Sequence, residues 1–190
     1  MTLDVNTAIG CSWAALSLVW LAGVLFTKRT VRSQPTGTRL FHLALIALGF
    51  SLLGAKWFSV GWLGERFLAD SAQVAWVGLV LTIAGCLFAV WARLTLGSNW
   101  SARATVKAGH ELITRGPYAL SRHPIYTGLM IAVIGTALAR GEWRCVLAFV
   151  VILVGLLVKM GQEERLMLQT FPETYAAYRQ RVKALIPGLF

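Results

Sequence analysis

Five apolar runs, each bounded by charged or polar residues, constrain this chain more than any other feature of its sequence. A helix that crosses the hydrocarbon core of a bilayer needs about 20 predominantly apolar residues. The runs cover residues 8–26, 40–58, 74–92, 125–139 and 143–158. The last two are short and only Arg140-Gly141-Glu142 separates them, so we expect a helical hairpin that either crosses the bilayer or re-enters from one side. The sequence therefore predicts a single-domain, all-α integral membrane protein with about five transmembrane helices.

The composition agrees with this prediction. Of the 190 residues, 57% are hydrophobic and 14% are charged, whereas an ordinary globular chain has roughly 45–50% apolar and about 25% charged residues. This balance excludes intrinsic disorder, a collagen-like fibre and a secreted disulfide scaffold. Cys11, Cys86 and Cys145 lie far apart inside apolar runs, which is neither a disulfide framework nor a zinc pattern. We expect no metal site.

The distribution of basic residues predicts the orientation. If the N-terminus lies outside, fourteen of the 18 Lys and Arg residues fall on the inner side, as the positive-inside rule requires. Residues 93–124 and the tail 159–190 then share the cytoplasmic face. Topology and anionic lipid headgroups explain the net charge of +10, so membrane lipids, and not nucleic acid, are the expected partners.

The C-terminal tail carries an amphipathic helical pattern. Pro172 can open a helix, and Pro187-Gly188 can end it. One apolar-aromatic stripe recurs at helical spacing, formed by Tyr175, Tyr178, Val182 and Leu185. Such a helix either lies on the membrane surface or contributes its stripe to a ligand site.

A first group of candidate functional residues is Arg122-His123-Pro124. Pro124 suits the first turn of a helix, which places His123 near the N-cap. A helix start presents unpaired N–H groups and partial positive charge to an anion, and Arg122 adds a donor for a carboxylate or phosphate. The alternative is a basic membrane flank before an ordinary helix start.

A second group is Glu163-Glu164, just beyond the fifth run, with Lys159 four residues before Glu163. That spacing places Lys159 and Glu163 on one helix face, where they can pair. Ionisable residues at membrane depth usually have a partner or a function, although a solvated pair at the interface would look the same. No nucleotide-binding glycine loop or His-Glu-x-x-His motif accompanies them.

Taken in order, these residues resemble the integral-membrane isoprenylcysteine carboxyl methyltransferases and the related phospholipid N-methyltransferases, as a short prokaryote-type member. The resemblance covers roughly the C-terminal half of the chain. The segments that carry it are 110–114 (HELIT), 116–118 (GPY), 122–128 (RHPIYTG), 163–164 (EE) and 171–178 (FPETYAAY).

The resemblance implies a methyltransferase that uses S-adenosylmethionine and transfers the methyl group directly to a lipophilic acceptor. That acceptor is a prenylcysteine-type carboxylate on a small or lipid-anchored substrate, or another lipid or small-molecule nucleophile. Arg122 and the helix start would suit the donor's carboxylate, and Glu163 its ammonium. By similarity, the donor site comprises His110, Glu111, Leu112, Ile113, Tyr118, His123, Pro124, Ile125, Tyr126 and Glu163.

The candidate catalytic residues are Lys159, Glu164 and Arg122. Lys159 stands where eukaryotic members of the family place an Arg that engages the substrate carboxylate, and an ammonium cannot make the planar fork of a guanidinium. An amine or thiol acceptor would have to lose a proton, for which Glu164, Glu163 and His123 are candidates. Two other functions stay open: an NADPH-dependent enzyme related to the sterol reductases, and a non-enzymatic membrane scaffold or transporter.

Overall fold

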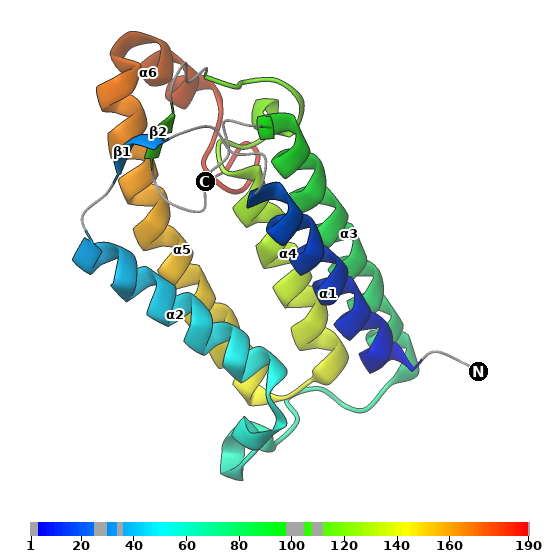
Figure 1. The fold of residues 1–190 in the computed structure, drawn as a ribbon. Coiled ribbons are helices and arrows are strands. Elements are labelled where there is room, and N and C mark those ends of the chain that lie inside the picture. Colours follow the sequence, from blue (N-terminus) through cyan, green and yellow to red (C-terminus); the bar gives the residue numbers. More distant parts are fainter. Residues whose placement is uncertain (1–3, 25–29, 34–35, 98–104, 108–111, 190) are drawn as a thin grey trace.

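The structure is a computed structural model that describes residues 4–24, 30–33, 36–97, 105–107 and 112–189. Helices dominate it (Figure 1). Among the described residues, short 3₁₀ helices lie in the connections as η1 (Lys56–Phe58), η2 (Gly61–Gly64) and η4 (Gly116–Ala119). The longer elements are α1 (Val5–Val24), β1 (Thr30–Ser33), α2 (Thr36–Gly54), α3 (Ala72–Leu96), β2 (Thr105–Lys107), α4 (Pro124–Arg140), α5 (Trp143–Thr170) and α6 (Pro172–Arg181).

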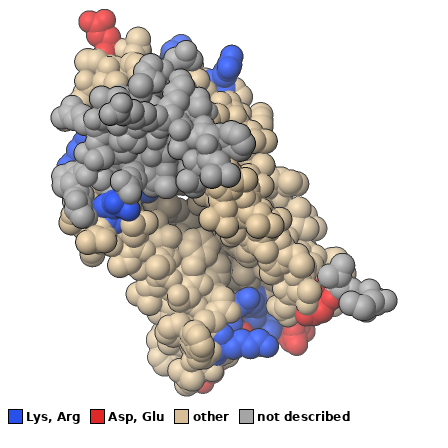
Figure 2. Space-filling model, in the orientation of Figure 1, with Lys and Arg blue, Asp and Glu red and all other residues tan. Residues whose placement is uncertain are grey.

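The apolar runs form apolar helices, and the predicted all-α membrane fold is confirmed. Within the described chain, α1, α2, α3 and α5 are long and apolar enough to cross a bilayer, and α4 is an apolar helix of 17 residues. Charged side chains gather toward the two ends of the molecule, and the flanks of α1 and α2 between them carry none (Figure 2). The protein is a multi-pass integral membrane protein.

The helix that contains the fifth apolar run extends beyond the end of that run. The apolar run ends at Val158, but the helix continues to Thr170 and is 28 residues long. Lys159, Glu163 and Glu164 are therefore part of the last turns of α5 and do not lie in a separate tail. A change from apolar to charged residues ended the run in the sequence, yet these residues are good helix formers and keep the backbone helical.

A short antiparallel ribbon was not predicted. β1 pairs with β2 through Thr30 with Lys107, Arg32 with Val106, and Ser33 with Thr105. The ribbon lies beside the last turns of α5, at the same end of the molecule as α6 (Figure 1). The segment after α1, the segment after α3 and the C-terminal tail thus share one end of the bundle, as the charge distribution predicted.

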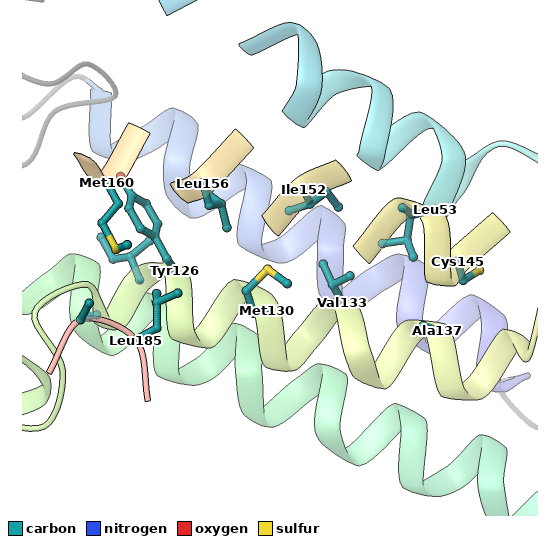
Figure 3. Packing of buried hydrophobic residues seen from close by; sticks show 14 of the residues in the cluster. Leu53, Tyr126, Met130, Val133, Ala137, Cys145, Ile152, Leu156, Met160 and Leu185 are labelled. Carbon is teal, nitrogen blue, oxygen red and sulfur yellow. The ribbon is translucent and has the colours of Figure 1, made fainter. Parts of the chain in front are cut away.

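The helices form two groups, α1, α3 and α4 on one side and α2 with α5 on the other (Figure 1). The expected tight link between α4 and α5 is present: Gly141 adopts a left-handed conformation with φ 66° and donates its N–H to Ala137 O. Beyond this link the two helices separate. Their facing apolar side chains, among them Met130, Val133, Ile152 and Leu156, form one buried cluster (Figure 3).

Glycines bring α3 and α4 into close contact. A Cβ atom on Gly85 would lie 2.4 Å from the backbone nitrogen of Ala132, and one on Gly128 would lie 2.7 Å from that of Ala89. Small residues at such positions allow two membrane helices to pack backbone against backbone. This contact fixes the position of α4, whose first turn and the residues just before it contribute to the candidate site.

Arg144 fastens α2 to the start of α5. Its side chain is only 2% exposed and donates to the carbonyl oxygens of Leu52 and Leu53 at 2.7 and 3.2 Å. Its guanidinium also pairs with Glu142, with Nε 2.7 Å from Oε2. Arg144 thereby supplies hydrogen bonds to carbonyl groups at the end of α2 that have no partner within the helix. In the charge count, the same residue was only a basic residue beside a membrane helix.

We expect Gly85→Ala to destabilise the protein by about 1–3 kcal/mol, because the added methyl group overpacks the α3–α4 contact. The measurement is the thermal unfolding midpoint of the purified protein in detergent. Gly161→Ala is the matched control, since a Cβ atom there meets nothing within 4 Å and Ala is the better helix former. Equal midpoints for the two variants would contradict the close packing of α3 on α4.

Candidate functional site

A cavity of about 920 Å³ extends between the two helix groups. Its wide part is apolar, with walls from α1, α2, α4 and α5 that include Leu16, Leu43, Ile46, Ile152 and Leu156. One end is polar. We use the name polar end for the five lining residues Arg122, His123, Tyr126, Lys159 and Glu163.

Glu163 faces the cavity and is held at its wall. Its Oε2 accepts a hydrogen bond of 2.7 Å from the Tyr126 hydroxyl, and its Oε1 lies 3.7 Å from Lys159 Nζ. The Lys159 ammonium also lies 5.4 Å from the centre of the Tyr126 ring. The expected pairing of Lys159 with Glu163 along one helix face is thus present. The Glu163 side chain is 22% exposed. A carboxylate in this position can hold a cationic group that enters the cavity.

Glu164 has a different environment and does not line the cavity. Arg122 donates to its Oε1 from Nε at 2.9 Å and from Nη2 at 2.6 Å. His123 Nε2 lies 3.3 Å from the same oxygen, and Arg179 Nε lies 3.4 Å from Oε2. Three cationic groups surround this carboxylate and favour its charged form. Glu164 is therefore placed to organise Arg122, His123 and Arg179.

His123 bridges the two glutamates. Its Nδ1 lies 3.6 Å from Glu163 Oε2 and its Nε2 lies 3.3 Å from Glu164 Oε1. Burial lowers the pKa of His123, but the hydrogen bonds and charges of the two carboxylates outweigh burial and raise the pKa above its usual value of 6.5. The imidazole ring stacks on Tyr126, with ring centres 5.4 Å apart.

The chain after α6 binds the start of α4. The backbone N–H groups of Arg122 and His123 donate to Lys183 O and Ala184 O at 2.8 and 3.0 Å. The hydroxyl of Ser121 also donates to Ala184 O, at 2.6 Å. These bonds require an extended backbone, so α6 ends at Arg181, and the prediction that the helix continues to Pro187-Gly188 was wrong.

This arrangement bears on the expected anion site at the start of α4, which stays a prediction. The tail carbonyls occupy the N–H groups of Arg122 and His123. The Arg122 side chain is also committed, because its Nη1 donates to Val182 O and its other nitrogens bind Glu164. Arg122 lines the cavity, but its hydrogen bonds serve mainly to join α4, α5 and the tail.

The tyrosines of α6 face the protein interior. Tyr175 and Tyr178 are each 3% exposed and line the cavity, so the stripe does not lie against lipid. The Tyr178 hydroxyl donates to the carbonyl oxygen of Tyr118. Burial raises the pKa of Tyr178 to about 12, so this hydroxyl stays protonated and keeps the bond over the neutral pH range.

The structure brings most of the sequence-predicted site residues to one place. Pro124 is buried at the first position of α4 and supports the turn without lining the cavity. His110 and Glu111 lie outside the described residues. The predicted residues that line the cavity are Leu112, Ile113, Tyr118, Arg122, His123, Ile125, Tyr126, Lys159 and Glu163.

Sequence reasoning missed the deep part of the cavity. Trp13 and Phe50 contribute to its wall from α1 and α2, and Thr136 and Arg140 from α4. The sequence placed these residues inside or at the end of apolar runs, where composition does not reveal which side chains face one another.

Comparison with known proteins finds one family whose model matches this chain. The model of the "Isoprenylcysteine carboxyl methyltransferase (ICMT) family" matches residues 76–169. This region contains most of α3, all of α4 and nearly all of α5, and therefore both the His123 turn and the paired glutamates. Over these residues the chain is similar to the ICMT family.

Several relatives carry the ICMT name. A probable protein-S-isoprenylcysteine O-methyltransferase from Oryza sativa subsp. indica is 33% identical over 117 residues, which is 60% of this chain and 61% of the relative. Protein-S-isoprenylcysteine O-methyltransferase B from Arabidopsis thaliana is 29% identical over 127 residues, 64% of each chain. The matched regions thus cover about three fifths of these two relatives.

One similar protein has a different name. The cobalt-zinc-cadmium resistance protein CzcN from Cupriavidus metallidurans is 32% identical over 117 residues, 60% of this chain and 52% of that protein. In the part of the chain that the structure describes, no group of three or more His, Cys, Asp or Glu side chains is placed to hold a metal ion.

The raised pKa of His123 predicts a pH-dependent stability. A group whose pKa is higher in the folded than in the unfolded state stabilises the fold below its unfolded pKa and loses this effect as pH rises through the folded value. We expect the thermal midpoint of wild-type protein to exceed that of His123→Gln most at about pH 6, and by progressively less toward about pH 9. Glu173→Gln, at an exposed position on α6, is the control. A wild-type advantage that is constant over this range would contradict an imidazolium between the glutamates.

Proposed function

We propose that this chain is an S-adenosylmethionine-dependent methyltransferase that acts on a lipophilic acceptor carrying a carboxylate. The observation that carries the proposal is that one cavity joins an apolar space between membrane helices to a polar end holding Glu163 and Lys159. A lipid chain and a charged donor can occupy the two parts at the same time.

The residues at the polar end suit the donor. A cavity of about 920 Å³ is within the usual range of ligand sites, roughly 300–1,000 Å³. Glu163 would hold the donor's ammonium. The rings of Tyr118 and Tyr126 line the same end and would face its adenine or its sulfonium. His110 and Glu111 belong to this proposed donor site by their similarity to the family's motif.

The chemistry needs little from the protein beyond positioning. When bound, S-adenosylmethionine supplies a methyl group whose bond to sulfur breaks, with its electron pair going to sulfur, as the acceptor oxygen bonds to the methyl carbon. Because a carboxylate oxygen is already a nucleophile, the protein has no proton to remove. Orientation of two reactants can supply about 7–11 kcal/mol, and Glu164 acts as a positioning residue that holds Arg122 and His123.

Lys159 is the residue that we assign to the acceptor. Lys159 lines the cavity with its ammonium 3.7 Å from Glu163 Oε1, where it would attract the acceptor carboxylate. The names of the plant relatives support a prenylcysteine carboxylate as the acceptor group. Since an ammonium makes a single point contact, the carboxylate would be held less rigidly than by an arginine.

The acceptor would enter from the bilayer. The cavity is lined by α1 and α2, and the surface is hollowed between them on the face that Figure 2 shows. We propose that the N-terminus lies outside and that the polar end faces the cytoplasm, because basic residues concentrate at that end. The similarity to the ICMT family does not favour the alternatives of a sterol-reductase-like enzyme or a scaffold.

Isothermal titration calorimetry with S-adenosylhomocysteine tests the donor site. We expect the wild-type protein in detergent to bind this product, and Glu163→Gln to bind it at least about tenfold more weakly, because a charge-assisted bond to the ammonium is lost. Glu173→Gln is the matched control and should bind as the wild type does. Wild-type binding of NADPH with none of S-adenosylhomocysteine, or undiminished binding by Glu163→Gln, would contradict the proposal.

A further inference from the structure

A hydrogen-bonded chain of three side chains crosses the interior of the first helix group. The indole N–H of Trp13, on α1, donates to Thr136 Oγ1, on α4, at 3.0 Å. Thr136 Oγ1 lies 3.2 Å from Thr82 Oγ1, on α3. Thr136 and Thr82 are 1% and 0% exposed. Polar groups in such surroundings strongly favour their partners, so the indole is held in one orientation.

The same indole reaches across the cavity. Trp13 meets the ring of Phe50, on α2, edge to face, with ring centres 5.3 Å apart. Both rings line the cavity. Trp13 therefore forms a bridge between the two helix groups, fixed on one side by Thr136 and in contact on the other with Phe50.

The position of this bridge can be measured along α4. Thr136 lies ten residues after Tyr126, and at a rise of 1.5 Å per residue the two are about 15 Å apart along the helix axis. Tyr126 belongs to the polar end. An apolar chain that starts at the polar end thus has about 15 Å before it meets the Trp13–Phe50 bridge.

An isoprene unit contributes four chain bonds of about 1.5 Å each, and therefore about 5 Å of extended length. Three units fill the distance to the bridge, whereas a fourth unit meets the indole of Trp13. We infer that Trp13, oriented by Thr136, is a specificity-determining residue that favours acceptors with three isoprene units over acceptors with four. This inference rests on the proposed methyltransferase function.

The test compares two acceptors, N-acetyl-S-farnesylcysteine and N-acetyl-S-geranylgeranylcysteine, with radiolabelled S-adenosylmethionine and purified protein in detergent. The wild type should have the higher kcat/KM with the farnesyl acceptor. In Trp13→Ala the ratio of geranylgeranyl to farnesyl kcat/KM should rise at least about tenfold, the order expected when a pocket gains or loses a few carbon atoms.

Two further variants separate the role of Trp13 from loss of folding. Thr136→Val keeps the shape of the side chain but removes the hydroxyl that orients the indole, and should raise the same ratio about threefold. Trp76→Ala removes an indole that is 55% exposed on α3 and does not line the cavity, and should leave the ratio unchanged. S-adenosylhomocysteine binding by each variant reports a folded donor site.

The outcomes distinguish this inference from the proposed function. If the wild type methylates the farnesyl acceptor but Trp13→Ala and Thr136→Val keep the wild-type ratio, the chain-length role of Trp13 is overturned and the methyltransferase stands. A wild type that prefers the longer chain overturns it as well. If the wild type binds S-adenosylhomocysteine but methylates neither acceptor, the prenylcysteine acceptor and this inference both fail, whereas the donor site stands.

Discussion

The ion pair between Arg122 and Glu164 is the contact on which the site depends. Its shortest distance is 2.6 Å, and the two side chains are 8% and 12% exposed. A buried charge without its partner is costly, so the turn before α4 and the last turns of α5 must come together even though some forty residues separate them in the sequence. This contact also brings His123 between Glu163 and Glu164.

The rest of the polar end follows from that contact. Arg122 binds the tail carbonyl of Val182 as well as Glu164, so one guanidinium connects α4, α5 and the chain after α6. With Glu164 neutralised by its cations, the neighbouring Glu163 is left to face the cavity. The adjacent carboxylates thus have different roles. Glu164 stabilises the fold, and Glu163 lies at the cavity wall, where a cationic ligand can bind.

Below the polar end, the way in which the helices diverge shapes the cavity. α4 is fixed against α3 by the Gly85 and Gly128 contacts, and α5 is fastened to α2 by Arg144. The two pairs meet at Gly141 and separate toward the polar end (Figure 1). The space between them is lined by apolar side chains and lies at membrane depth, which is why a lipophilic acceptor fits this architecture.

The sequence predicted the features that depend on local pattern. Hydrophobic length identified the membrane helices, and the few charges next to apolar runs pointed to Arg122, Lys159 and Glu163. The prediction from sequence was wrong where one residue pattern is compatible with two backbone conformations. The stripe through Val182 and Leu185 matches a helix, but an extended chain is preferred there because its carbonyls bind the turn before α4.

Other features depend on contacts between distant residues. Arg144 looks like a membrane flank until its carbonyl partners on α2 are known. Trp13 and Thr136 lie in different apolar runs, and their hydrogen bond depends on how α1 packs against α4. The spacing of residues within one run carries no information about such contacts.

Amide hydrogen exchange with and without S-adenosylhomocysteine tests most directly whether the joined segments enclose a donor. The account predicts added protection in three places together: residues 121–127, the last turns of α5 around Glu163, and residues 182–185. The connection at 56–64, at the opposite end of the helices, should exchange at an unchanged rate. Added protection confined to residues 56–64 would contradict the claim that the Arg122–Glu164 contact builds the donor site. Exchange rates that are the same with and without saturating ligand in every segment would contradict it as well.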